Sequence, residues 1–268
     1  MENSELTHWG IKGMKWGVRR YQNKDGTLTA AGKERYYTES SLDIKTNSDG
    51  SRTVPKGFKF NRVGQDQIDI NASGALYVSY GQKDASRYVK SLGPTLMGKL
   101  LGEYGTTVQH LSVREPIKIP NESTTNIELS KMLLENPKLL QKYNDSLYSL
   151  VYTGSFDKNV TKRDLDYIID NPNSDSAKKM TYTISSFFGD PNFSKETSAI
   201  YSRFRELGYD ALPDYHDIMS GTSETAMVIF NPEKIKMTSG IRITKETMKE
   251  AKEYLKQFEK LKVSEVLK

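Results

Sequence analysis

The order of its predicted strands and helices most restricts how this chain can fold. Strand-like segments, recognised by alternation or by short apolar runs, come in two groups. They lie at residues 58–63, 75–80, 107–113, 117–120, 209–212, 225–230 and 235–237. Between the groups, residues 125–207 carry apolar residues at helical spacing, broken at Asn136-Pro137 and Asn171-Pro172. Strands, then helices, then strands predict an α+β domain with an antiparallel-rich sheet.

Composition divides the chain into four parts. Residues 1–37 hold both tryptophans and a cluster of glycines. Residues 38–56 are rich in Ser, Asp, Asn, Thr and Gly, which is typical of a linker. Residues 57–240 carry the strand and helix patterns, and residues 241–268 predict a charged C-terminal helix. We therefore expect one core domain with smaller appendages.

Composition also excludes several kinds of chemistry. The chain has no cysteine, which rules out disulfides, thiolate metal sites and cysteine nucleophiles. Its three histidines, His8, His110 and His216, lack metal-ligand spacing, so we expect no metal site. The net charge of +5 permits contact with nucleic acid or phosphate but does not require it. No apolar run approaches a membrane span and the N-terminus is not a Sec-type signal, so we expect no membrane contact and a cytoplasmic protein.

The segment GALYVSYGQKDASRYV, residues 74–89, is the most informative stretch. Tyr77 lies on a predicted strand, and Tyr88 follows on a predicted helix. A strand, loop and helix of this length return the first helical turns beside the strand, so the two phenol rings can face each other across a slot. Electron-rich rings favour a flat cationic heteroaromatic ring between them. The alternative is an ordinary strand–helix unit with two core tyrosines.

This segment resembles the second motif of the diphtheria-toxin and poly(ADP-ribose) polymerase branch of the ADP-ribosyltransferases, in which two tyrosines occur at the same spacing. In that family the pair holds the nicotinamide of NAD, and the resemblance implies this role for Tyr77 and Tyr88. It also implies a split antiparallel sheet with inserted helices. NAD would then be the bound substrate.

Further residues extend the resemblance towards NAD binding. The family's first strand supplies a His or an Arg that holds ribose or the nicotinamide amide. Here the strand before Tyr77 offers Arg62, followed by Gly64, in the style of the cholera-like branch, and Ser79 is a partial counterpart of that branch's Ser-Thr-Ser strand. An arginine presents a fork of donors that suits ribose oxygens or phosphate. The alternative for Arg62 is a solvated surface arginine.

Glu224 matches the family's catalytic glutamate in type and placement, because it opens an apolar segment after a polar loop, residues 213–223. Cleavage of NAD passes through an oxocarbenium-like ribosyl centre. A carboxylate beside that centre stabilises the developing positive charge. The alternative is a rim glutamate at the start of a strand. Thr222 stands where arginine-modifying members have Glu or Gln, which argues against arginine as the acceptor.

The stretch HWGIKGMKWGVRRYQNKDGTLTAAGKERY, within residues 1–37, resembles a motif of structural and head-morphogenesis proteins of phages and prophages of Gram-positive bacteria. A basic, tryptophan-containing peptide can dock on a capsid or portal partner, or contact nucleic acid. The alternative is a cap packed on the chain's own core. The resemblance implies a phage-encoded protein that acts in the host bacterial cytoplasm or is packaged in the virion.

Three functions are compatible with the sequence. The first is a mono-ADP-ribosyltransferase, a toxin or effector that transfers ADP-ribose from NAD to a host macromolecule. The second is a non-enzymatic virion or head-morphogenesis protein with a degenerate transferase fold. The third is an NAD glycohydrolase, in which water is the acceptor.

Overall fold

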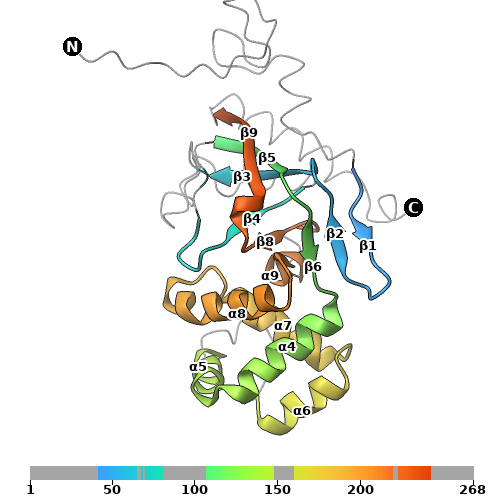
Figure 1. Ribbon diagram of the computed structural model, residues 1–268. Coiled ribbons are helices and arrows are strands. Elements are labelled where there is room, and N and C mark those ends of the chain that lie inside the picture. Colours follow the sequence, from blue (N-terminus) through green and yellow to red (C-terminus); the bar gives the residue numbers. More distant parts are fainter. Residues whose placement is uncertain are drawn as a thin grey trace, which may run out of the picture.

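The computed structural model describes residues 42–64, 68, 70–80, 88, 107–147, 160–219 and 223–242. The predicted N-terminal segment 1–37 and the C-terminal helix beyond residue 242 lie outside them. Figure 1 shows the strands in one half of the molecule and the helices α4 to α8 in the other, with α9 between the two. This arrangement confirms the α+β class that the order of the segments predicts.

The strands are short, and every pairing between those described is antiparallel. They form three sheets, β1-β2-β6, β3-β5-β9 and β4-β8-β7. The strands are β1 (Lys45–Thr46), β2 (Arg52–Val54), β3 (Lys59–Gly64), β4 (Leu76–Val78), β5 (Thr107–Val113), β6 (Ile117–Ile119), β7 (Ala211–Pro213), β8 (Met227–Ile229) and β9 (Ile235–Arg242).

A single bridge joins the second and third of these sheets. The Asn61 N–H of β3 donates to the Ser79 carbonyl oxygen at 2.6 Å, and the Ser79 N–H donates to the Asn61 carbonyl oxygen at 2.9 Å. From edge to edge the strands then follow the order β7-β8-β4-β3-β5-β9. The two three-stranded sheets thus behave as one antiparallel sheet that is split between β4 and β3.

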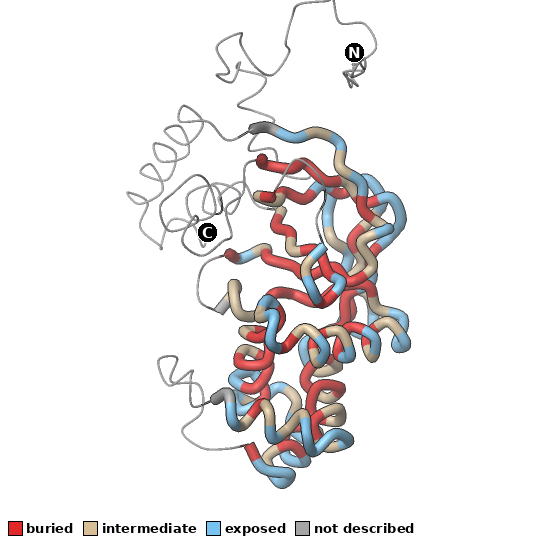
Figure 2. Tube along the Cα trace, turned by 90° about the vertical axis from the view of Figure 1, so that its left-hand side faces the viewer, coloured by how far each residue is buried: buried red, intermediate tan, exposed pale blue. Residues whose placement is uncertain are grey.

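Alternation along β4 sends its side chains to two different cores. Leu76 and Val78 are buried in a core that includes Phe60 and Leu111 of the sheet β3-β5-β9. Tyr77, between them, packs instead against the core formed with the helices. Figure 2 shows buried stretches in both halves of the molecule. The tyrosine therefore lies where the strands meet the helices.

The buried Asp210, just before β7, links β7 to β6 and to the residues that follow β8. Its Oδ2 accepts the backbone N–H of Lys118 in β6 at 2.9 Å. Its Oδ1 accepts from the Asn231 side chain at 2.6 Å and lies 2.7 Å from Lys234 Nζ. A buried carboxylate that is fully hydrogen-bonded and paired avoids the cost of lost hydration. Asp210 therefore fixes β7 against β6 and the end of β8.

The helices begin and end where the sequence supplies caps and breaks. They are α4 (Glu122–Glu135), α5 (Pro137–Leu147), α6 (Lys162–Asp170), α7 (Asp175–Ser186), α8 (Ser194–Glu206) and α9 (Tyr215–Met219), with 3-10 turns η2 (Pro191–Phe193) and η3 (Pro232–Lys234). Asn121 caps α4 by accepting the Thr124 N–H at 2.7 Å. The predicted breaks at Asn136-Pro137 and Asn171-Pro172 are confirmed.

The Arg203 guanidinium of α8 joins two helices that are distant in sequence. Its Nε and Nη2 both donate to Glu128 Oε2 of α4, at 3.0 and 2.9 Å. Glu128 is 7% exposed, whereas the Arg203 side chain is 32% exposed, so water reaches the guanidinium side of this contact. In the part of the chain that the structure describes, no helix combines the length and the apolar composition needed to cross a bilayer.

Two boundaries differ from those predicted. The folded domain begins before residue 57, because β1 and β2 lie in the segment expected to be a linker, and Val54 of β2 is fully buried opposite Ile117. The polar loop expected at residues 213–223 contains the short helix α9. Both segments are polar in sequence, and their structure depends on pairing or packing with distant elements.

Candidate functional site

Tyr77 places its ring between the sheet β4-β8-β7 and the helices. Its hydroxyl lies near Gly189 and close enough to the Tyr201 hydroxyl of α8 for each to influence the pKa of the other. Neither hydroxyl makes a hydrogen bond of ordinary geometry to the described residues. Burial raises the pKa of Tyr77 far above its usual range, and Tyr201 and Asp214 raise it further. The phenol therefore stays neutral and offers its ring and its proton.

Tyr88 is helical, and its hydroxyl donates a short hydrogen bond to Asp217 Oδ2 of α9. The Ser223 side chain lies close enough to this hydroxyl to influence its pKa. Burial is the largest cause of a strongly raised Tyr88 pKa, followed by the charge of Asp217. Asp214 and Asp217 act on both Tyr77 and Tyr88. Both predicted tyrosines thus feel the charge of the same two carboxyl groups, and Tyr88 contacts one of them.

The sequence analysis missed this carboxyl pair. Asp214 follows β7 directly, is 6% exposed, and accepts the Asp217 N–H at 3.2 Å through Oδ1. Its own N–H donates to the Ala226 carbonyl oxygen at 3.0 Å, which fixes it beside β8. Burial, and after it the charge of Asp217, raises the Asp214 pKa from 3.8 to about 7. The signal that could have revealed the pair is an Asp three residues before a second Asp, which is typical of a helix start.

Asp214 predicts a measurable dependence of stability on pH. The folded protein retains a proton on Asp214 between the ordinary pKa of 3.8 and the raised value of about 7, whereas the unfolded chain has lost it. This contribution is fully present below the ordinary pKa and is lost as pH rises through about 7. We expect the melting temperature of the wild type to fall across this window more steeply than that of Asp214→Asn, measured by calorimetry. Parallel pH profiles would contradict the assignment.

Glu224 is exposed and stands three residues before β8. Its neighbours on both sides are fixed. The Ser223 N–H donates to the Asp217 carbonyl oxygen and the Thr225 N–H to Ser223 Oγ, both at 3.1 Å. Thr225 Oγ1 accepts the Tyr80 N–H at 3.1 Å. Glu224 therefore lies in a short segment that hydrogen bonds hold to Asp217 of α9 on one side and to Tyr80, after β4, on the other.

Arg62 and Tyr77 lie on opposite faces of the sheet. Arg62 Nη1 donates to Gln109 Oε1 of β5 at 3.3 Å. Asn61, which pairs with Ser79, points to the opposite face of β3 from Arg62, because neighbouring residues of a strand alternate. Ser79 and Tyr77, two residues apart on one strand, share a face, so Asn61 rather than Arg62 lies on the face of the tyrosine.

Gly64 is the last residue of β3 and is buried opposite Thr107 of β5. Gly64 and Arg62 therefore both contact β5. Gly64 and Arg62 belong to the sheet β3-β5-β9, whereas Tyr77, Glu224 and Asp214 gather around β4-β8-β7. Roles for Arg62 and Gly64 in binding NAD stay predictions.

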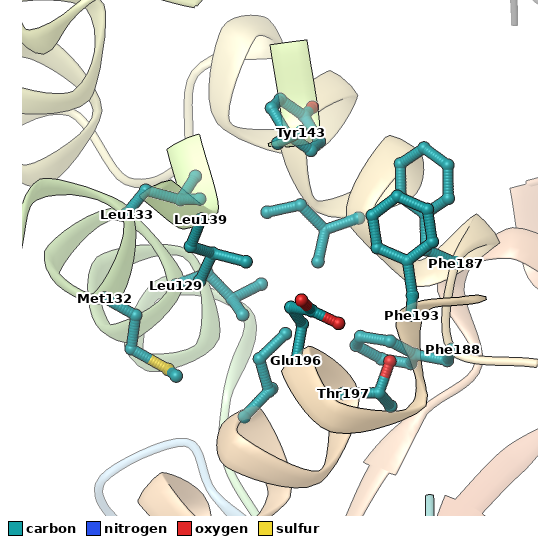
Figure 3. Close-up of a pocket in the computed structure, with 12 residues that line it drawn as sticks. Leu129, Met132, Leu133, Leu139, Tyr143, Phe187, Phe188, Phe193, Glu196 and Thr197 are labelled. Carbon is teal, nitrogen blue, oxygen red and sulfur yellow. The ribbon is translucent and has the colours of Figure 1, made fainter. Parts of the chain in front are cut away.

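A small cavity in the helical half is a separate feature, shown in Figure 3. It measures about 20 Å³, which is room for one water molecule and not for a cofactor. Apolar side chains of α4, α5, α7 and α8 dominate its lining, and Glu196 and Thr197 of α8 are its polar members. The candidate functional site therefore remains the cluster of tyrosines and carboxyl groups.

Comparison with known proteins gives a match at the N-terminus. A family described as "Family of unknown function (DUF7211)" matches residues 2–23. The searches of the curated proteins and of the solved structures found no match. The matched residues end before the first described strand, β1, so the match concerns the N-terminal segment and not the candidate site.

Proposed function

We propose that this chain binds NAD and transfers ADP-ribose from it to a host macromolecule, as a phage- or prophage-encoded mono-ADP-ribosyltransferase. The observation that carries the proposal is that the Asp214–Asp217 pair contacts Tyr88 and raises the pKa of both Tyr77 and Tyr88, next to the segment that holds Glu224. These residues come from distant parts of the sequence. Their meeting at one place is what a site for a single ligand requires.

The cluster suits the nicotinamide end of NAD. The nicotinamide ring of NAD is flat and positively charged, and the faces of phenol rings attract such a cation. Asp214 and Asp217 add negative potential to the same place whenever they are ionised. The Tyr88 hydroxyl is held by Asp217, which limits rotation of the ring and prepares a fixed surface for stacking. Positive charge is therefore favoured where the two tyrosines lie.

Cleavage of NAD moves the positive charge from the nicotinamide ring to the ribose. When the bond between the nicotinamide nitrogen and the ribose breaks, its electron pair stays with nicotinamide, which leaves as a neutral molecule. The positive charge appears on the ribosyl centre, and the acceptor adds there and releases a proton. Glu224 is exposed, on a segment held by hydrogen bonds next to the tyrosines and the carboxyl pair. A carboxylate there can stabilise the ribosyl cation and can also reach an acceptor molecule.

The sheet arrangement supports the same proposal. The resemblance to the ADP-ribosyltransferases implies a split antiparallel sheet with inserted helices. In this chain β4 carries Tyr77 and pairs with β8, which Glu224 precedes, and a single bridge links β4 to β3. The helices inserted between β6 and β7 pack against Tyr77.

The N-terminal segment fits a protein that acts with a phage particle. The matched residues 2–23 lie inside the basic, tryptophan-containing segment 1–37. A short basic segment that holds a match to a family model of its own is compatible with a docking peptide. We propose that this segment binds a capsid or portal partner and brings the catalytic domain with it into the host cytoplasm.

Replacement of Tyr77 tests the nicotinamide site. Tyr77→Ala removes the ring, and base-stacking energies predict a loss of NAD affinity of about tenfold or more by isothermal titration calorimetry. Tyr77→Phe keeps the ring and removes a hydroxyl that makes no hydrogen bond of ordinary geometry to the described residues, so its affinity should stay within about twofold of the wild type. Tyr167→Ala, at a half-exposed tyrosine of α6, is the control for nonspecific effects. Equal affinities of Tyr77→Ala and the wild type would exclude the stacking role.

A further inference from the structure

Two buried aspartates flank β7, and their surroundings differ in charge. Asp210 is 5% and Asp214 6% exposed, so both carboxyl groups have lost most of their contact with water. Lys234 Nζ lies 2.7 Å from Asp210 Oδ1, and the Lys118 N–H and the Asn231 side chain donate to the same carboxylate. Across the described residues, no ion pair includes Asp214. A buried carboxylate without a positive partner is costly, so the two positions favour different charge states.

Phenol groups and a second carboxyl group face Asp214. Besides burial, its charge helps to raise the pKa of Tyr77 in β4, of Tyr88 and of Tyr201 in α8. Burial, and after it the charge of Asp217 in α9, raises the pKa of Asp214 itself. The Asp217 N–H donates to Asp214 Oδ1 at 3.2 Å, which offsets part of the cost of a charge there. These neighbours supply hydrogen-bond donors and negative potential.

Two further side chains that carry or can carry positive charge lie on the same helices. The Arg205 guanidinium of α8 donates through Nε to the Phe230 carbonyl oxygen at 3.0 Å and lies over the ring of that residue. The His216 ring of α9 stacks on Tyr182 of α7, with centroids 5.4 Å apart. In the described part of the chain, neither forms an ion pair with Asp214.

Two buried hydroxyl groups beside Asp214 also lack partners. Tyr201 is fully buried, and neither its hydroxyl nor that of Tyr77 makes a hydrogen bond of ordinary geometry to the described residues. The Tyr201 ring is fixed, edge-on to Phe188 at 5.5 Å and stacked on Phe230 at 5.2 Å between centroids. Buried polar groups are nearly always hydrogen-bonded in folded proteins. Two such hydroxyls beside a carboxyl group without a positive partner indicate that a polar, positively charged ligand group completes the cluster.

We propose that Asp214 is a proton switch, a neutral acid in the free protein that releases its proton when a positively charged ring binds beside the tyrosines. The inference rests on the proposed function, because it takes the nicotinamide ring of NAD as that cation. On release, the O–H bond of the acid breaks, its electron pair stays on the carboxylate and the proton passes to water. The bound ring then supplies the positive partner that Lys234 supplies to Asp210.

The switch couples affinity for NAD to pH. The pKa of Asp214, raised to about 7 by burial and by Asp217, sets the range. Below this value the proton competes with the cation, and above it the carboxylate is already ionised, so the affinity rises with pH and then levels off. The stability of the free protein changes in the opposite direction, because the ionised Asp214 lacks its positive partner until the ligand binds. The same charge favours NAD over its reduced form, whose nicotinamide ring is neutral.

Calorimetric titrations of the full chain with NAD and with ADP-ribose, which lacks the nicotinamide ring, test the switch. From about pH 5.5 to about pH 8.5, the affinity of the wild type for NAD should rise by about tenfold or more, because a neighbouring positive charge favours an ionised carboxyl group by at least that factor. The affinity for ADP-ribose should change by less than about twofold over the same range. Titrations at neutral pH in two buffers of different ionisation enthalpy should show that NAD binding releases protons.

Two substitutions assign the proton. Asp214→Asn keeps the size of the side chain and an oxygen that can accept the Asp217 N–H, but it cannot ionise. Its affinity for NAD should stay at the low wild-type value of acidic pH throughout the range. His216→Gln is the matched control, because histidine also changes charge near neutral pH. It should keep the pH dependence of the wild type. Thermal denaturation checks that both variants fold, and the two ligands test the wild type without any variant.

The outcomes separate the switch from the proposed activity. If the wild type binds NAD equally well at acidic and alkaline pH, the switch fails and the nicotinamide site stands. A pH dependence that persists in Asp214→Asn, or that only His216→Gln removes, overturns the role of Asp214. If NAD binding follows pH as expected but NAD is never cleaved, the switch stands and the activity fails. If the wild type binds NAD at neither pH, both fail.

Discussion

Glu224→Gln is expected to slow the cleavage of NAD by about 100-fold to 1,000-fold, the range seen when a group that stabilises transition-state charge is removed. Glutamine keeps the size of the side chain and removes the negative charge that the ribosyl cation needs. NAD affinity should change little, because the tyrosine cluster is intact. The initial rate of nicotinamide release at saturating NAD measures the effect. The free energy of unfolding should change by no more than about 0.5 kcal/mol, the range usual for substitutions at exposed sites such as Glu224.

The chain offers a matched control for this substitution. Glu233 is also exposed and lies in η3, after β8. Glu233→Gln removes the same charge from the other end of the strand and should leave the rate unchanged. A rate in Glu224→Gln that equals the wild-type rate would remove the catalytic assignment, whatever the tyrosines bind.

Phe230→Ala is expected to lower the free energy of unfolding by about 3–5 kcal/mol, because it empties a well-packed position between the sheet and the helices. Phe230 is 1% exposed at the end of β8 and stacks on Tyr201 of α8, with ring centroids 5.2 Å apart. The Arg205 guanidinium lies over the same ring, at 5.6 Å from its centroid, and its Nε donates to the Phe230 carbonyl oxygen at 3.0 Å.

Urea denaturation followed by circular dichroism measures this loss. Tyr167→Ala is the control, because Tyr167 of α6 is 51% exposed and its truncation should cost less than about 1 kcal/mol. If Phe230→Ala is equally mild, the strands and helices do not share the core described above, and the placement of Tyr77 between them loses its support.

The sequence predicts the elements that carry strong local signals. The strand at Lys59–Gly64 and the strand at Thr107–Val113 follow from apolar or alternating runs, and the helix ends at Asn136 and Asn171 follow from the prolines after them. In each case the periodicity or the backbone restriction lies within a few residues. Tyr77 is likewise found on the strand that its apolar neighbours predict.

Features that depend on pairing between distant segments could not be predicted in this way. β2 lies in a polar segment and owes its structure to pairing with β6. The face on which Asn61 and Arg62 lie is set by the register with Ser79, because a shift of one residue exchanges them. The raised pKa of Asp214 likewise comes from burial against elements that are remote in sequence.

Incubation of the full chain with radioactively labelled NAD and a host bacterial lysate tests the central claim most directly. The proposed function predicts label on a macromolecule with the wild type and with Glu233→Gln, and a loss of at least about 100-fold with Glu224→Gln. Release of free ADP-ribose without labelled macromolecule would identify water as the acceptor and replace the transferase with an NAD glycohydrolase. NAD that stays intact with the wild-type chain would contradict the account.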